Sequence, residues 1–195
     1  TIADAAAALI SLNIKKPGSL RKENDAKLLE MLLNSRRFRD IELFGYSHLF
    51  DAATQTQFSA VTFRPSKNKL YVFFRGTDST LVGWKEDFNM CFVCPVPAQS
   101  NAVDYLNRIA ASNGGDITVG GHSKGGNLAV YASAFCEQAA RRRITHIYNY
   151  DGPGFTEDVL NSDSYKSICV LVNTFVPQSS VVGMLLGHEE KYTII

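Results

Sequence analysis

One stretch of the sequence decides the fold, namely Ile117-Thr118-Val119-Gly120-Gly121-His122-Ser123-Lys124-Gly125-Gly126-Asn127. It reads as a short buried strand that turns abruptly into a helix, with a G-x-S-x-G motif at the turn. In that setting the motif holds the central residue, Ser123, as a nucleophile. Gly121 and Gly125 leave room for strand and helix to approach, and the helix N-terminus offers N–H groups to a developing anion. The alternatives are a glycine-rich turn that only caps a helix, or a phosphate cradle, although no G-x-x-x-x-G-K-[ST] is present.

The sequence on either side of this stretch predicts an α/β fold. Runs rich in Val, Ile, Phe and Tyr are typical of strands, and Ala- and Leu-rich amphipathic runs are typical of helices. We expect strands over Glu42–Asp51, Gln57–Phe63, Leu70–Phe74, Ile117–Val119, Ile144–Tyr150 and Ile168–Phe175, with another beginning in Lys191–Ile195. We expect helices over Ile2–Leu12, Glu23–Arg37, Ala98–Ala111 and Asn127–Ala140, and an irregular surface segment over Thr77–Pro97. This alternation predicts an α/β-hydrolase-like, mostly parallel sheet with helices on both faces and an antiparallel hairpin at its start.

Length and composition limit the partners. The chain has 195 residues, is 45% apolar and carries a net charge of +1. This size favours a single domain over residues 1–195, with residues 1–40 as a helical N-terminal segment. The near-neutral charge argues against nucleic acid as a partner, and no apolar run approaches the roughly 20 residues of a membrane span. Because the chain begins with Thr1 rather than Met and is compact for this fold, we expect it to be part of a longer protein.

Cysteine usage indicates a reducing compartment. Four cysteines are too few and too scattered for a disulfide framework in a chain of this size, so we expect a cytoplasmic protein. Cys91 and Cys94 form a lone C-x-x-C, but no second pair of ligands completes a metal site. We expect neither a metal nor an organic cofactor.

A serine nucleophile requires a base and an acid to orient it. In α/β-hydrolases the order is Ser, acid, His, which leaves His146 and His188 after Ser123. His146 lies within a predicted strand, whereas His188 follows a glycine in a loop, so we expect His188 to be the base. Asp151 directly follows the strand after the nucleophile helix and is the candidate acid, although an Asp at that position is also a common turn residue.

The oxyanion site requires two hydrogen-bond donors. One is expected from the backbone N–H of Lys124, the residue after the nucleophile. The other is expected from Thr77, which follows the predicted strand ending in Phe74-Arg75-Gly76. The alternative for Thr77 is a helix-capping role.

Several of these motifs together resemble the fungal-type class 3 lipases. They are Phe74-Arg75-Gly76-Thr77, Trp84 before Asp87-Phe88, and Gly121-His122-Ser123-Lys124-Gly125-Gly126. The chain is still more similar to a bacterial family of lipase-like α/β-hydrolases that shares G-H-S-K-G-G-N, Y-N-x-D-G-P-G-F and P-Q-S-S-x-V-G-M-L-L. The resemblance runs from about Phe58 to the end. It implies Ser123 as nucleophile, Thr77 as oxyanion residue and His188 as base, because His188-Glu189-Glu190-Lys191-Tyr192 resembles the lipase segment that carries the catalytic histidine.

The resemblance departs at two points. The loop after the later strand, where class 3 lipases carry an Asp, holds Ser180. Either Asp151 has taken that role or the triad is reduced to a Ser–His dyad. No lipase lid is recognisable between Trp84 and Pro97.

The predicted function is that of a serine hydrolase acting on a small acyl ester or lipid-like substrate through an acyl-enzyme on Ser123. One alternative is a hydrolase-shaped binding or scaffold protein without turnover. Another is a thioesterase or acyltransferase that uses the same site.

Overall fold

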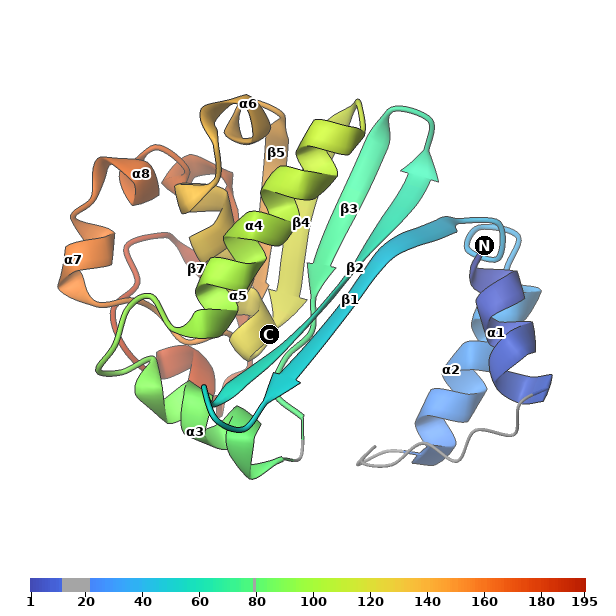
Figure 1. The fold of residues 1–195 in the computed structure, drawn as a ribbon, viewed down its shortest axis with the longest axis horizontal. Helices are drawn as coiled ribbons and strands as arrows, with labels where there is room; N and C mark the ends of the chain where they lie inside the picture. The colour runs from blue at the N-terminus through green and yellow to red at the C-terminus, as the bar shows by residue number, and fades with distance from the viewer. Residues whose placement is uncertain (12–21, 79) are drawn as a thin grey trace.

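The computed structural model describes residues 1–11, 22–78 and 80–195. The chain begins with α1 (Ile2–Ser11) and α2 (Lys22–Asn34). These two helices lie side by side near the start of the first strand, away from the rest of the sheet (Figure 1). Helices are therefore present where the sequence predicts them, and the predicted end of the first one at Leu12 lies outside the described residues.

The centre of the molecule is a mixed sheet in which spatial order follows chain order (Figure 1). Its strands within the described residues are β1 (Glu42–Asp51), β2 (Thr56–Ser66), β3 (Lys69–Phe74), β4 (Asp116–His122), β5 (Ile144–Tyr150), β6 (Val172–Val176) and β7 (Tyr192–Ile194). The pairs β1–β2 and β2–β3 are antiparallel. Every pairing from β3 to β7 is parallel. The predicted mostly parallel sheet with an antiparallel start is confirmed.

The helices that follow connect the strands. They are α3 (Leu81–Asn89), α4 (Pro97–Ser112), α5 (Lys124–Phe135), α6 (Gln138–Arg141), α7 (Glu157–Leu160) and α8 (Asp163–Lys166), with 3-10 turns η1 (Cys169–Leu171) and η2 (Val182–Met184). The predicted helix Asn127–Ala140 starts three residues earlier, at Lys124, and is interrupted at Cys136, whose backbone is extended. Across the described residues, no helix is both long enough and apolar enough to cross a bilayer.

The core lies between the sheet and helices α4 and α5. Alternate residues of the central strands, such as Val72, Phe74 and Val119, are fully buried and meet Leu106 of α4 and Leu128 of α5. Burying each such side chain contributes about 1.5–3 kcal/mol. The core therefore fixes the direction in which the carboxyl ends of β3, β4 and β5 point, and these ends carry the candidate site.

The opposite face of the sheet carries aromatic side chains that remain partly exposed. The ring of Tyr148 stacks on His146 and Tyr150 at centroid distances of 6.0 Å, and Tyr150 stacks on Phe175 at 5.5 Å. Burial and the neighbouring tyrosines raise the pKa of Tyr71 on the same face to about 12. We expected helices on both faces of the sheet, but α4 and α5 both pack on the other one. The alternate positions facing α4 and α5, such as Val72, Phe74 and Val119, are fully buried, whereas Tyr148 and Tyr150 on this face remain partly exposed.

Candidate active site

Ser123 lies at the turn from β4 into α5, with a backbone conformation that L-residues rarely adopt. Its φ is 57° and its ψ is −130°. Such backbone strain costs on the order of 1–3 kcal/mol and persists where the surrounding structure holds it. The Ser123 N–H donates to the carbonyl of Tyr150 on β5 at 2.9 Å, and the Ser123 carbonyl accepts from Gly126 at 2.8 Å. The direct passage from strand to helix is the arrangement that the sequence predicts.

Two glycines allow α5 to approach the sheet at this turn. A Cβ on Gly121 would lie 2.3 Å from the carbonyl oxygen of Gly125. A Cβ on Gly125 would lie 2.2 Å from the carbonyl oxygen of Phe74 on β3. Any larger residue at either position would push α5 away from the strands. The close packing therefore requires glycine two residues before and two residues after Ser123.

The loop after β3 lies against this turn. A Cβ on Gly76 would lie 3.4 Å from the Cβ of Ser123. Thr77 follows directly, and its hydroxyl donates to Asp87 Oδ2 at 2.5 Å. Lys124 is the first residue of α5, so its N–H has no carbonyl within the helix to donate to. The loop that carries Thr77 thus lies against Ser123 through Gly76, and Lys124 follows Ser123 directly in the sequence.

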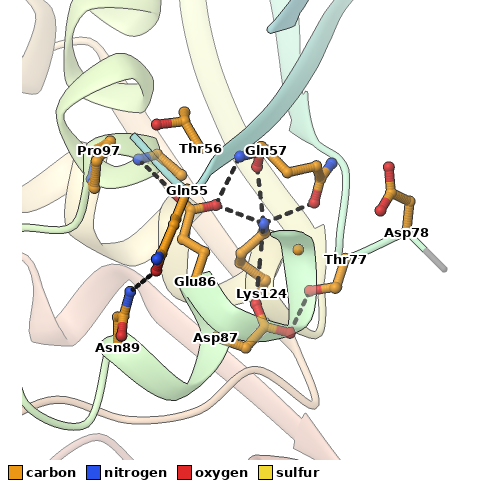
Figure 2. Close-up of polar contacts among 12 residues, drawn as sticks. Gln55, Thr56, Gln57, Thr77, Asp78, Glu86, Asp87, Asn89, Pro97 and Lys124 are labelled. Carbon is orange, nitrogen blue, oxygen red and sulfur yellow. Dashed lines mark hydrogen bonds and ion pairs between the residues drawn. The ribbon is translucent and has the colours of Figure 1, made fainter. Parts of the chain in front are cut away.

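The side chain of Lys124 is buried in a polar network between α3, α5 and the start of β2 (Figure 2). Its Nζ donates to the backbone carbonyl of Gln57 at 2.8 Å, to Gln57 Oε1 at 2.7 Å and to Glu86 Oε2 at 2.9 Å. The side chains of Lys124 and Glu86 are 1% and 0% exposed. Asp87 Oδ1 lies 3.9 Å from the same ammonium, and burial raises the pKa of Asp87. The sequence-based prediction used only the backbone of Lys124 and missed this network.

Helix α3 itself was also missed, because Gly83 and Trp84 made the segment look irregular. The structure caps it with Thr80, whose hydroxyl accepts from Gly83 N–H at 3.2 Å. Its outer face is apolar and exposed: Leu81 is 80%, Trp84 54% and Phe88 67% exposed. A spacing of three and four residues is typical of one helical face. That spacing was the available signal, and it would have put Glu86 on the opposite, buried face.

Asp151 lies beside the turn that carries Ser123, but its side chain does not make the expected contact with His188. It follows β5 directly, with φ 56°, and its N–H donates to the carbonyl of Phe175 on β6 at 2.8 Å. The carboxylate accepts a hydrogen bond from the hydroxyl of Ser180. The carboxylate of Asp151 therefore contacts Ser180 instead of the expected His188.

His188 is held by a different carboxylate, Glu190. Its Nδ1 lies 3.1 Å from Glu190 Oε1. Glu190 also accepts from the hydroxyls of Tyr165 at 2.6 Å and Thr174 at 2.7 Å. Burial acts to raise the pKa of Glu190, but the hydrogen bonds outweigh it and lower the pKa to about 2. The sequence-based prediction named Asp151 as the candidate acid and did not include Glu190. In an extended segment, however, residues two apart share a side.

Comparison with known proteins identifies the family from the part of the chain that forms the sheet and the site. The sequence profile of the Mbeg1-like family matches residues 32–195. The chain belongs to the Mbeg1-like family. No curated protein matches its sequence.

Solved structures similar to this Mbeg1-like chain include three lipases. A fungal lipase–inhibitor complex, presented as a model for interfacial activation in lipases, has a TM-score of 0.55 at 15% identity, over 74% of this chain and 60% of its own. A triacylglycerol lipase from Penicillium expansum has a TM-score of 0.51 at 12% identity, over 80% of this chain and 70% of its own. M37 lipase has a TM-score of 0.50 at 14% identity, over 80% of this chain and 62% of its own.

These likenesses show the fold. The Mbeg1-like chain has a lipase-like α/β-hydrolase fold, and the predicted resemblance to fungal-type class 3 lipases is confirmed as a distant structural match. The chain spans 60% of the length of the fungal lipase in the inhibitor complex.

The structure of the Mbeg1-like chain brings some of the predicted residues together and leaves others apart. Ser123, Thr77, Lys124 and Asp151 gather at the carboxyl edge of the sheet. Neither ring nitrogen of His188 contacts Ser123: Nδ1 faces Glu190, and the buried Nε2 has no hydrogen-bond partner among the described residues. A strained serine at a helix N-terminus can attack a carbonyl carbon, and an imidazole whose Nδ1–H donates to a carboxylate keeps Nε2 as a proton acceptor.

Proposed function

We propose that this Mbeg1-like chain carries the acyl-enzyme site of a serine hydrolase that cleaves carboxylic esters, with Ser123 as the nucleophile. The observation that carries the proposal is the backbone of Ser123, with φ 57°. Glycine would occupy this conformation at much lower cost. Ser123 also stands at the N-cap position of α5 without a side-chain capping hydrogen bond. A helix-capping role therefore does not account for the serine, whereas a reactive hydroxyl does.

The reaction has two steps. The Ser123 oxygen attacks the ester carbonyl while the base takes its proton, and the N–H groups of Thr77 and Lys124 stabilise the resulting oxyanion. The tetrahedral intermediate collapses, the carbon–oxygen bond to the alcohol breaks, and the alcohol leaves with the proton from the base. Water then attacks the acyl-enzyme by the same route and releases the acid and Ser123.

We assign the base to His188 and the orienting carboxylate to Glu190. The contact between His188 and Glu190 supports this assignment, because in a neutral imidazole whose Nδ1–H donates to Glu190 the lone pair is on Nε2. Since Nε2 does not contact Ser123, the assignment requires the segment between β6 and β7 to carry His188 toward Ser123 when substrate binds. Asp151 is the alternative carboxylate, because it lies beside the turn that carries Ser123.

Two isosteric variants separate these assignments. If Glu190 orients the base, Glu190→Gln slows acylation by about 100-fold or more, since the wrong histidine tautomer is then favoured, whereas Asp151→Asn has little effect. The measurement is the rate of Ser123 acylation by a p-nitrophenyl ester. The reverse result would return the orienting role to Asp151, and an active His188→Ala variant would exclude His188 as the base.

The substrate that we propose is an uncharged ester with an apolar acyl chain. The exposed apolar face of α3 begins four residues after Thr77, where an acyl chain bound at the oxyanion site would extend. Val181, Met184 and Leu185, in the turn that packs on Asp151, are also exposed. The fold likeness to a triacylglycerol lipase supports the same class of substrate.

A fluorophosphonate probe tests the nucleophile directly. The wild-type protein is expected to be labelled at Ser123, as identified by peptide mass spectrometry, and Ser123→Ala is expected to remain unlabelled. Ser133→Ala is the matched control, because Ser133 is a buried serine of α5 whose hydroxyl is bonded to the carbonyl of Ala129. A folded wild-type protein that resists labelling would contradict the proposal.

One observation favours a second candidate function. Because Ser123 and His188 are not hydrogen-bonded, a hydrolase-shaped protein that binds an apolar ligand without turnover fits the same fold. In that case the wild-type protein would bind a long-chain ester but neither hydrolyse it nor react with the probe.

A further inference from the structure

We propose that the buried ammonium of Lys124 is a positioning group, which together with Glu86 fixes the Lys124 backbone N–H as an oxyanion donor. This inference rests on the proposed function and adds residues to it that touch no substrate. It assigns to Lys124 a second role, distinct from the one its backbone has by following the nucleophile.

The contacts of Lys124 leave its ammonium no freedom. Its three N–H groups have three acceptors, which are the Gln57 carbonyl at 2.8 Å, Gln57 Oε1 at 2.7 Å and Glu86 Oε2 at 2.9 Å. The side chain spans from the nucleophile turn to the start of β2 with only 1% of its surface exposed. The first residue of α5 is thus held at both ends, by the strained turn at its backbone and by the ion pair at its tip.

Glu86 is itself fixed from separate elements (Figure 2). Its Oε2 also accepts from the backbone N–H of Gln57 at 3.0 Å, and its Oε1 accepts from the N–H of Ala98 in the first turn of α4 at 3.0 Å. The carboxylate therefore joins β2, α4 and α5 through α3. A displacement of Lys124 would break its bonds to β2 and to α3 at once.

The next residue of α3 holds the other oxyanion residue. Asp87 accepts from the hydroxyl of Thr77, and its second oxygen lies 3.9 Å from the Lys124 ammonium. Consecutive side chains of one helix therefore hold the two residues whose N–H groups would bind the oxyanion. An apolar pair could fill the same space, but it would lack the directional hydrogen bonds that set the position of a donor.

The test compares Lys124→Met with the wild type by the second-order rate of fluorophosphonate labelling at Ser123. Because displacing one oxyanion donor slows reaction at the serine by about tenfold to 1,000-fold, we expect a loss in this range. For p-nitrophenyl butyrate we expect kcat to fall while KM stays within about twofold. Arg143→Met is the matched control. Arg143 donates to the carbonyls of Gly115 and Ala110 at the opposite edge of the sheet, so its loss lowers the melting temperature without slowing the labelling of folded protein.

Each outcome decides the inference. A folded Lys124→Met that labels at the wild-type rate would overturn it, and Lys124 would then be structural only. If Lys124→Met does not fold, the variant Lys124→Met/Glu86→Gln, without the unpaired buried charge, takes its place. Labelling of the folded double variant at the wild-type rate would equally overturn the inference. If the wild type is not labelled at all, the proposed function itself is wrong. That outcome is distinguishable from failure of the present inference, because it is seen without any change at Lys124.

Discussion

At the scale of single residues, Ser123 combines a requirement of the fold with a requirement of chemistry. The turn from β4 into α5 needs a residue at φ 57° and ψ −130°, and only glycine accepts this without strain. A serine in place of glycine therefore carries a cost in backbone strain at this position. The strain itself can be measured independently of any activity.

We predict that Ser123→Gly is more stable than Ser123→Ala by about 1–3 kcal/mol, the range expected for a strained non-glycine backbone. Both variants remove the hydroxyl, so their difference isolates the conformational strain. The gain is reduced by the extra entropy of glycine in the unfolded chain. Urea unfolding followed by circular dichroism checks this. Equal midpoints for the two variants would show that the turn is relaxed.

Glu190, whose carboxylate contacts His188, predicts a pH dependence of stability. The pKa of Glu190 is lowered from its ordinary value of 4.5 to about 2, so the folded state binds its proton less readily than the unfolded state. The group therefore contributes about 3 kcal/mol of stability above pH 4.5, and this contribution is lost as the pH falls toward 2.

Glu190→Gln isolates this contribution from the other carboxylates. The variant is expected to be less stable than the wild type at pH 7, and the gap should narrow as the pH is lowered from 5 to 3. Urea midpoints at each pH provide the measurement. A gap that stays constant over that range would mean that the pKa of Glu190 is the same in the folded and the unfolded protein.

At the scale of elements, α3 has two faces with separate tasks. Glu86 on one face is fully buried, whereas Leu81, Trp84 and Phe88 on the other are exposed. Exposed side chains contribute little to folding, so their replacement changes stability by less than about 0.5 kcal/mol. If this face binds an acyl chain, the same replacements change substrate preference.

We therefore predict that Trp84→Ser/Phe88→Ser lowers kcat/KM for a p-nitrophenyl ester with an eight-carbon acyl chain by about 10-fold or more, since each lost CH2 contact is worth about 0.8 kcal/mol. Hydrolysis of the acetate should be unchanged. Met31→Ser on α2, another exposed apolar side chain, is the matched control. An equal loss with both esters would mean that the α3 face does not bind the acyl chain.

The elements that were predicted well are those whose consecutive residues follow one clear pattern. Strands β1 and β5 have the predicted bounds, because their apolar and aromatic runs end at clear turn residues. Helix α3 was missed in part because the contacts that stabilise it are made with distant residues. Glu86 contacts Gln57 and Lys124, and no local pattern shows which distant charge a Glu will meet.

The same limit explains the candidate site. The placement of Ser123, Thr77 and Lys124 at one edge of the sheet could be predicted, because it follows from a strand, a turn and a helix in sequence. The partner of His188 was not, because it depends on how a loop folds back onto β6. Short-range spacing predicts which backbone atoms meet, whereas hydrogen bonds between side chains depend on tertiary packing.

At the scale of the whole molecule, the two faces of the sheet differ in kind. Buried aliphatic and aromatic side chains under α4 and α5 form the core, and stacked, partly exposed rings occupy the other face. Tyr71 lies on that other face, and burial raises its pKa to about 12. It should therefore titrate well above the ordinary tyrosine value of 10. The loss of that transition in Tyr71→Phe, followed by ultraviolet absorbance, would assign it.

The ion pair of Lys124 also determines how the molecule opens. Its acceptors lie 67 and 38 positions away along the chain, and an unpaired buried charge is strongly unfavourable. The start of β2, α3 and the first turns of α4 and α5 should therefore unfold as one cooperative unit. The amides of Gln57 and Ala98, which both donate to Glu86, should exchange with deuterium through the same opening event, with equal opening free energies and equal sensitivity to urea.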